Sequence, residues 1–304
     1  MPLPKHNRQS LEEKGLFEFF EFHRGGLVLP DAPLCGLTLR AAGSMRFRWN
    51  ETNQNREKLL SLFDEFASQT SQGLTRQAAP VCDVQMPGAS PSMTKVLVPV
   101  QLDHTHIVYD VHEAGDTNGK IGDGIITVNR ELIPTVTVAD CMPLYLYDPV
   151  TGLFGIVHSG WKGTGIAADA IGLACREYGA RAEDFCVVIG PHIRDCCYIV
   201  NEDRAAWFSK NFTPECVRPL EDGVEVSWNN GGGPLFRLSL EKANLAALQK
   251  AGLPRENIWI HPACTCCYKD KDSGEYIYGS NRRETSAAGT PDKFTVQAAF
   301  IFAD

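Results

Sequence analysis

The chain has 304 residues, of which 43% are apolar and 22% charged, and its net charge is −8. This is enough apolar material for the core of one large domain or two small ones. The acidic balance argues against a nucleic-acid partner, because surfaces that bind nucleic acid carry an excess of Lys and Arg. The first twenty-five residues lack the basic and apolar regions of a signal peptide, and no apolar run approaches the ~20 residues of a membrane span. We therefore expect a cytoplasmic protein with no membrane partner.

Eleven cysteines are many for such a chain, and their number is odd. Without a secretory signal, free thiols are a better expectation than a disulfide framework. We expect most of them to be small buried residues and a few to be ligands.

The chain divides near residue 40. Residues 1–40 are rich in aromatic residues and predict an N-terminal extension, followed by a single domain over residues 41–304. Phe17, Phe19, Phe20 and Phe22 are expected to form a packing surface or the contact of a homodimer. Beyond the boundary, the apolar spacing from Glu51 to Ala67 predicts a helix, and residues 71–93 predict a loop.

From Lys95 onward, short apolar runs rich in β-branched residues alternate irregularly with helical patterns. This mixture predicts an α/β or α+β fold built on mixed sheets, rather than a doubly wound sheet. Predicted strands cover 96–100, 107–111, 125–128, 135–138, 144–147, 154–157, 185–189, 258–261 and 295–302, and predicted helices follow Gly163 and cover 201–210 and 239–251.

A cysteine and a histidine stand at the two ends of one predicted hairpin. Cys141 comes just before the strand 144–147 and His158 just after the strand 154–157, with a turn between them at 148–152. Both side chains should therefore reach the same end of the strand pair. A thiolate and an imidazole placed together are either metal ligands or a nucleophile with its base.

A third candidate ligand, His104, precedes another predicted strand. Its neighbour His106 competes for the same role, and we favour His104. One Cys and two His ligands leave one position open on a zinc ion, as in catalytic zinc sites. Copper is less favoured, because copper oxidases combine several His-x-His pairs and this chain has one.

Three sequence blocks resemble the laccase-domain family, also called multicopper polyphenol oxidase-like, whose members are described as purine nucleoside phosphorylases with adenosine deaminase activity. Weaker similarities bring the covered segment to about residues 95–302. The three blocks are Ala139-Asp140-Cys141-Met142-Pro143 with the strand after it, His158-Ser159-Gly160-Trp161-Lys162-Gly163-Thr164, and Ile189-Gly190-Pro191-His192-Ile193 with Cys196-Cys197-Tyr198.

The resemblance implies a fold and a metal site. The fold would be a sandwich of mixed sheets with helices outside. The family's zinc ligands correspond to His104, Cys141 and His158, although the family's Gln-Val-His motif reads Leu102-Asp103-His104 here.

It also implies an activity: zinc-dependent phosphorolysis or deamination of adenosine and inosine, with methylthioadenosine as a further substrate. Purine nucleosides and phosphate would be its small-molecule partners. The expected catalytic residues are Cys141, His158 and Asp140, with Asp103 as an alternative carboxylate that shuttles protons. The expected phosphate and substrate ligands are Arg40, Ser159, Lys162 and Arg283.

Other functions remain open at this stage. Cys141 and His158 alone would suit a metal-free hydrolase or amidase, and the family name leaves a polyphenol oxidoreductase open. A non-catalytic interaction protein with the same fold is a further alternative. A second zinc site from Cys196, Cys197, Cys264 and Cys267 is conceivable, but adjacent cysteines seldom bind one ion, so buried thiols are favoured.

Overall fold

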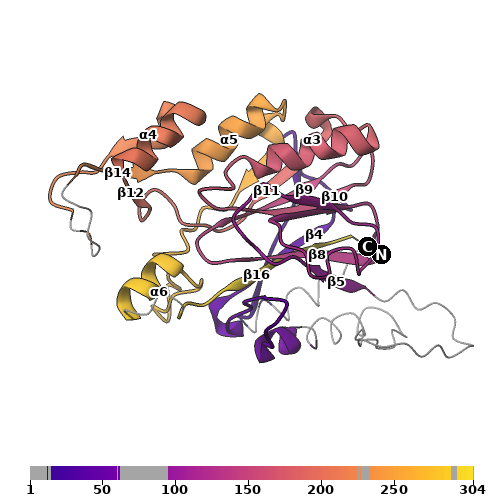
Figure 1. Ribbon diagram of the computed structural model, residues 1–304, viewed down its shortest axis with the longest axis horizontal. Coiled ribbons are helices and arrows are strands. Elements are labelled where there is room, and N and C mark those ends of the chain that lie inside the picture. The colour runs from indigo at the N-terminus through magenta and orange to yellow at the C-terminus, as the bar shows by residue number, and fades with distance from the viewer. Residues whose placement is uncertain are drawn as a thin grey trace, which may run out of the picture.

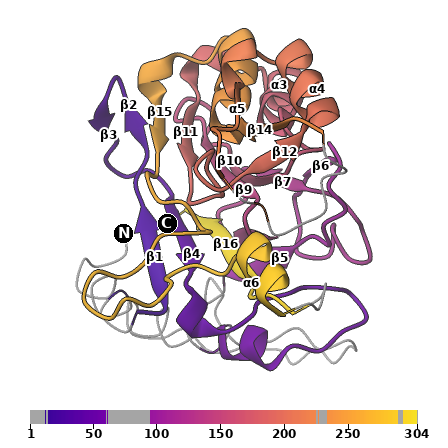
Figure 2. The same ribbon diagram turned by 90° about the vertical axis from the view of Figure 1, so that its left-hand side faces the viewer.

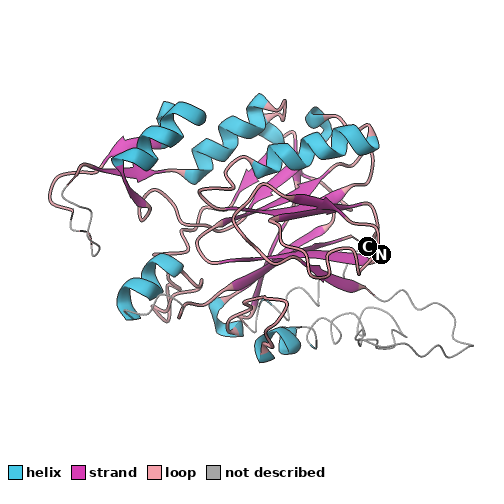
Figure 3. Cartoon of the chain, viewed as in Figure 1, coloured by secondary structure: helices cyan, strands magenta, loops and turns pink. Residues whose placement is uncertain are grey.

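The computed structural model describes residues 12, 15–59, 61, 95–224, 226, 233–288 and 293–303. Two mixed sheets lie face to face, and three helices cover the outer face of one of them (Figures 1 and 3). The predicted α/β sandwich with outer helices is confirmed.

The six-stranded sheet carries most of the predicted strands. In spatial order the strands are β15 (Ile258–Ile260), β11 (Cys186–Ile189), β9 (Met142–Tyr147), β10 (Phe154–Ser159), β7 (Gly124–Thr127) and β6 (Val108–Asp110). The antiparallel hairpin of β9 and β10 forms the centre of the sheet. Two strand pairs, β11 with β15 and β6 with β7, are parallel.

The five-stranded sheet joins the two ends of the sequence. In spatial order it contains β1 (Phe17–Phe20), β4 (Leu34–Thr38), β16 (Gln297–Phe302), β8 (Leu132–Val138) and β5 (Val96–Pro99). Residues expected to form an N-terminal extension thus supply two strands, and β4 pairs with β16. The described part of that segment belongs to the sheet of the domain, and Phe17, Phe20 and Phe22 are buried in it, which confirms the packing alternative for these rings.

Alternation along the hairpin explains the layers. Leu144 and Leu146 pack with the helices on one face, whereas Tyr145 and Tyr147 pack with the five-stranded sheet on the other. The Tyr145 hydroxyl donates to the carbonyl oxygen of Gly36 at 2.8 Å and so ties the two sheets together.

Glycine and serine set the helix ends where the sequence predicts them. Helix α3 (Ile166–Tyr178) lies between Gly165 and Gly179, both left-handed, and the Ser239 side chain accepts a bond from Lys242 N–H to cap α5 (Leu240–Lys250). The predicted helix at 201–210 is α4 (Glu202–Asn211).

Several elements were not predicted. They are a small sheet of β12 (Ile199–Asn201), β14 (Leu235–Leu238) and β13 (Val217–Pro219), the hairpin of β2 (His23–Arg24) and β3 (Leu27–Val28), α6 (Asn281–Ala288), and the 3-10 turns at Arg40–Ala42, Ala182–Asp184, Pro214–Cys216 and Arg255–Asn257.

Figure 2 shows α6 beside β16, on the side away from the three outer helices. The helix predicted from Glu51 begins at residue 54 and is described only in part, and the loop predicted at 71–93 lies outside the described residues. Across the described ranges, every helix is too short or too polar to span a bilayer.

Candidate metal centre and cavity

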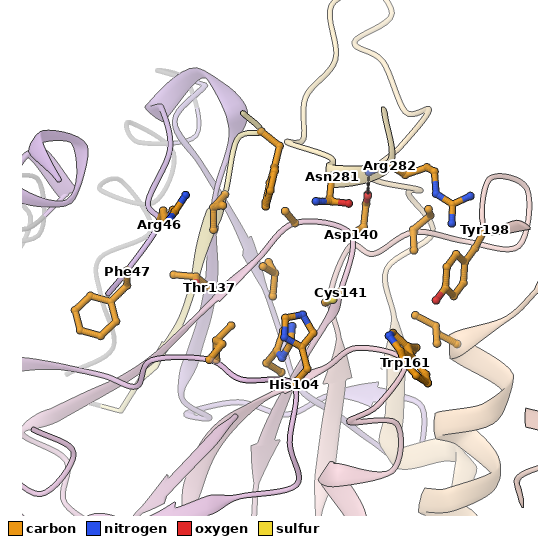
Figure 4. Close-up of a pocket in the computed structure, with 18 of the residues that line it drawn as sticks. Arg46, Phe47, His104, Thr137, Asp140, Cys141, Trp161, Tyr198, Asn281 and Arg282 are labelled. Atoms are coloured by element: carbon orange, nitrogen blue, oxygen red, sulfur yellow. Dashed lines mark hydrogen bonds between the residues drawn. The ribbon is translucent and has the colours of Figure 1, made fainter. Parts of the chain in front are cut away.

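Three side chains predicted as metal ligands meet at one end of the central hairpin. Cys141 immediately precedes β9, and His158 lies near the end of β10, opposite Pro143. His104 comes from the loop before β6, and candidate ligand atoms of the three residues all lie within 4.8 Å of one another. The two imidazole rings are perpendicular, with centroids 5.0 Å apart. Figure 4 shows His104 and Cys141 of this group.

Asp123 holds both histidines in place. Its Oδ1 accepts bonds from His104 N–H at 3.0 Å and from the His158 ring at Nδ1, 2.8 Å away. Its Oδ2 accepts from the backbone N–H and the hydroxyl of Thr105, each at 2.6 Å. These bonds stabilise His104 in the left-handed backbone conformation, with φ of 57°. Sequence reasoning missed this role, although Asp123 stands directly before a predicted strand.

The bond to Asp123 sets the protonation of His158. When Nδ1 carries the proton and donates it to the carboxylate, Nε2 is left with a lone pair for a metal ion. The Asp123 side chain is 0% exposed and the His158 side chain is 2% exposed. Two neutral imidazoles and a thiolate form a donor set that zinc favours. The residues present therefore fit a zinc ion.

Without an ion, Cys141 and His158 stabilise each other as a charged pair. Burial opposes the charged thiolate, but His158 and His104 outweigh it and lower the pKa of Cys141 to about 6. Burial likewise disfavours the imidazolium, but Cys141 and Asp123 raise the pKa of His158 to about 9. The thiolate needed for metal binding or nucleophilic attack is thus present at neutral pH.

Gly160 leaves room for the three ligands. A Cβ at this position would lie 3.0 Å from the Cys141 sulfur and 3.2 Å from Cδ2 of His104. A larger residue at position 160 would crowd the side chains of Cys141 and His104, which explains the glycine two residues after His158.

The competitor His106 is engaged elsewhere. Its Nδ1 lies 2.6 Å from a carboxylate oxygen of Asp169 and its Nε2 lies 2.9 Å from the carbonyl oxygen of Lys162. His104, rather than His106, therefore lies beside Cys141.

A cavity of about 450 Å³ opens beside the three ligands. Trp161 and Tyr198 lie on one side of it, and Arg46 and Phe47 lie on the opposite side (Figure 4). Its other lining residues include Arg48, Leu102, Thr137, Val138, Ala139, Asp140, Ile193, Arg204, Leu240, Asn281, Arg282, Phe294 and Val296.

Arginines and aromatic rings alternate along the Trp161 side. The Arg204 guanidinium lies over the Trp161 ring at 4.3 Å, and its Nη1 is 3.5 Å from the Tyr198 hydroxyl. Arg282 lies over the Tyr198 ring at 5.4 Å. Both arginines also line an adjoining hollow of about 310 Å³, together with Asn281. These cations were not among the sequence predictions.

Asp140 lines the cavity, but three hydrogen bonds from neighbouring groups hold its carboxylate in place. Its Oδ1 accepts from the Thr265 hydroxyl at 2.7 Å, and its Oδ2 accepts from the Ser280 hydroxyl at 2.9 Å and Arg282 N–H at 2.6 Å. Burial raises the pKa of Asp140, although these bonds oppose the rise. Its predicted catalytic role stays a prediction. The alternative carboxylate, Asp103, is exposed beside His104.

The four predicted phosphate ligands are not among the residues that line the cavity. Ser159 is buried and its hydroxyl donates to the Asn244 side chain at 3.0 Å, while Arg40 lies 3.5 Å from the Glu284 carboxylate. Lys162 is exposed. Arg283 donates from Nη1 to two carbonyl oxygens, those of Thr265 and Cys266, each at 2.9 Å. The positions of these four residues thus favour other roles for them.

Comparisons with known proteins agree on one family. The family described as multi-copper polyphenol oxidoreductase laccase matches residues 86–290. The purine nucleoside phosphorylase LACC1 of Mus musculus is 31% identical over 178 residues, which are 57% of this chain and 38% of that protein. The purine nucleoside phosphorylase YlmD of Bacillus subtilis (strain 168) is 31% identical over 172 residues, or 56% of each chain. The matched segment thus spans less than two thirds of either relative.

Solved structures share the fold. The hypothetical protein YfiH of Bacillus licheniformis superposes with a TM-score of 0.66 at 24% identity, covering 90% of this chain and 93% of that one. The Neisseria meningitidis protein NMB0706 superposes with a TM-score of 0.63 at 15% identity, covering 94% and 99%.

Proposed function

Because the chain belongs to the multi-copper polyphenol oxidoreductase laccase family, we propose that it is a zinc-dependent purine nucleoside phosphorylase. The names of its relatives, which are 31% identical, support this class of enzyme. The observation that carries the proposal is the meeting of His104, Cys141 and His158 beside a cavity lined by arginines and aromatic rings. Adenosine, inosine and methylthioadenosine are the proposed substrates.

Zinc fits the donor set better than a copper cluster does. When bound, zinc supplies a Lewis acid that polarises an oxygen and lowers the pKa of water. Two His and one Cys also suit a single copper ion, but a multicopper oxidase needs further copper centres rich in histidine. In the described ranges, the other group of possible ligands contains only cysteines.

The cavity offers separate places for the two reactants. Pockets of its size hold drug-sized molecules, and aromatic faces such as those of Trp161 and Tyr198 can stack with a purine. Arg204 and Arg282 border both the cavity and its side hollow, and planar guanidinium groups bind phosphate oxygens in pairs. We therefore assign phosphate mainly to Arg204, in place of Arg40, Lys162 and Arg283, with Arg282 beside it, whose Nη1 and Nη2 also donate to the carbonyl oxygen of Ile199 at 3.2 Å.

In phosphorolysis a phosphate oxygen bonds to C1′ of the ribose, the bond from C1′ to the purine nitrogen breaks, and the purine leaves with a proton. Arg204 and Arg282 hold the phosphate and offset its charge as it approaches. Asp140, the carboxyl among the described lining residues, stays the candidate for holding that proton, because burial raises its pKa. Deamination of adenosine is proposed as a second activity: a water oxygen would bond to C6, the bond from C6 to the amino nitrogen would break, and ammonia would leave with a proton carried by the same carboxyl.

The test measures products from adenosine and inosine with and without phosphate. Release of adenine or hypoxanthine only with phosphate supports phosphorolysis, whereas inosine formed from adenosine without phosphate identifies deamination. An Arg204→Ala variant should raise the KM for phosphate at least tenfold, while Lys162→Ala, outside the lining, should not. Zinc-loaded protein that turns over no purine nucleoside would overturn the proposal and favour an interaction protein.

The charged pair of Cys141 and His158 favours one alternative, a metal-free hydrolase or amidase. Metal analysis separates the two functions. About one zinc at this centre, lost in Cys141→Ser, supports the phosphorylase. Active protein that is free of metal and is inactivated by alkylation of Cys141 supports the hydrolase, and a bound copper ion would support the oxidoreductase.

A further inference from the structure

We propose that Cys196, Cys197, Cys264 and Cys267 bind a second, structural zinc ion, separate from the ion proposed at Cys141. The sulfur atoms of the four residues all lie within 4.8 Å of one another. The Cys196 sulfur lies 3.8 Å from that of Cys197 and 3.7 Å from that of Cys267. A tetrahedral zinc ion with Zn–S bonds of about 2.3 Å holds its four sulfurs about 3.8 Å apart. A disulfide needs about 2.05 Å.

The sheet explains why two distant sequence segments meet. Strands β11 and β15 are parallel neighbours, with Ile189 opposite Ile260. The chain therefore leaves both strands at the same sheet edge, and a bridge between His192 and Cys264 continues the pairing. The favoured expectation of buried thiols is wrong for Cys196 and Cys267, which are exposed, and the four cysteines considered from the sequence lie in one group.

Two backbone N–H groups donate to the sulfur of Cys264, the most buried of the four cysteines. Cys264 is only 5% exposed, and its sulfur accepts a bond from Arg194 N–H at 3.4 Å. The backbone N–H of Cys266 donates to the same sulfur. Bonds of this kind stabilise a thiolate and orient it toward a metal. Cys196 and Cys267 are exposed, so an ion can enter from solvent.

Two guanidinium groups flank the four cysteines. Arg237 donates from Nη1 to the carbonyl oxygens of Asp195 and Cys196, at 3.2 and 2.5 Å. Arg283 likewise donates from Nη1 to the carbonyl oxygens of Thr265 and Cys266, each at 2.9 Å. Arg237 also pairs with Glu221 and Arg283 with Glu284, so the two guanidinium groups order the segments that carry the cysteines and add no unpaired positive charge. This contact also gives Arg283 a function apart from phosphate.

The site would brace one wall of the cavity. Tyr198, next to Cys197, lines the cavity, and Thr265, next to Cys264, donates to Asp140 beside Cys141. Four thiolates fill all positions of a tetrahedral ion, so the site is closed and structural rather than catalytic. On binding, the zinc ion displaces the thiol protons to solvent.

The test counts zinc in the full chain purified under reducing conditions. We expect two zinc ions per chain in the natural protein and one in Cys141→Ser. In that Cys141→Ser background, adding Cys196→Ser or Cys267→Ser should bring the count near zero. Adding Cys266→Ser, a neighbouring cysteine outside the set of four, should leave one zinc.

A second measurement guards against variants that fail to fold. Cobalt replacing zinc in the Cys141→Ser protein should give strong thiolate-to-cobalt absorption, and removing the metal should expose four more thiols to a thiol reagent. Cys141→Ser protein that binds no metal, or a disulfide between Cys196 and Cys267 in the reduced protein, would overturn the proposal. So would loss of the ion in Cys266→Ser but not in Cys267→Ser. None of these readouts depends on turnover, so failure of the proposed function would leave them intact.

Discussion

Replacing Asp123 by Asn should weaken zinc binding while keeping the shape of the residue. The carboxylate accepts four hydrogen bonds, two on each oxygen, and is completely buried. An amide has one acceptor and one donor end. If its NH2 faced His158, the ring would have to move its proton from Nδ1 to Nε2, and Nε2 could no longer bind metal. We therefore expect the NH2 to face Thr105, whose backbone N–H then loses its acceptor.

The magnitude follows from these lost contacts. One charge-assisted bond and one unpaired buried N–H together cost about 2–4 kcal/mol of folding stability. The substitution also replaces the carboxylate that accepts a bond from the His158 ring by a neutral amide. Loss of such a partner lowers metal affinity by about 10- to 100-fold. Competition with a fluorescent chelator measures the zinc Kd, and urea unfolding measures the stability.

Asp103→Asn is the matched control, because this exposed carboxylate stands directly beside His104 in the sequence. Its zinc Kd should change less than threefold, as the Asp103 side chain is screened by water. The reasoning is refuted if the two variants bind zinc equally well, or if Asp123→Asn binds as tightly as the natural protein.

Three further predictions concern the same region. Gly160→Ala should weaken zinc binding at least tenfold, because its Cβ would lie 3.0 Å from the Cys141 sulfur; an unchanged Kd in chelator competition would contradict this. In metal-stripped protein, alkylation of Cys141 should rise through a midpoint near pH 6, because His158 outweighs burial in setting the pKa of Cys141, and a midpoint near 9 would refute the charged pair. Burial lowers the pKa of His192 to about 4, so between about pH 6.5 and 4 the unfolded chain binds a proton that the folded protein does not. Lowering the pH from 7 to 5 should thus cost about 2 kcal/mol in urea unfolding, and less in His192→Asn, whose amide can replace the ring donor to Gly190.

Local patterns predicted the hairpin and the meeting of Cys141 and His158 at one end of it. Asp148 accepts bonds from Val150 N–H and Thr151 N–H, so the turn that brings Cys141 and His158 together is encoded within a few residues. The ends of α3 and α5 were also predicted from nearby residues, because a capping glycine or serine acts on the adjacent helical turn. Such features can be read from one stretch of sequence.

Contacts between distant segments could not be predicted in this way. The aromatic residues near Phe17 looked like an extension because their strand β1 pairs with β4, which joins the domain through β16 at the other end of the chain. Arg204 and Arg282 of the cavity wall come from α4 and α6, and α6 was not predicted. The sequence does not distinguish Asp123 from other acidic residues that precede a strand. Its role follows from its bonds to His104 and His158, which lie 19 and 35 residues away in the chain.

The bonds of Asp140 bear on how the protein is made. The three side chains of the proposed metal centre lie between positions 104 and 158, but Asp140 reaches partners 125, 140 and 142 residues further along the chain. A nascent polypeptide that has left the ribosome only as far as residue 260 has the hairpin but none of these partners. The backbone of this loop can bond to Ile193 early, but the Asp140 side chain is fixed only when synthesis is almost finished, so an ion captured earlier would be held less tightly.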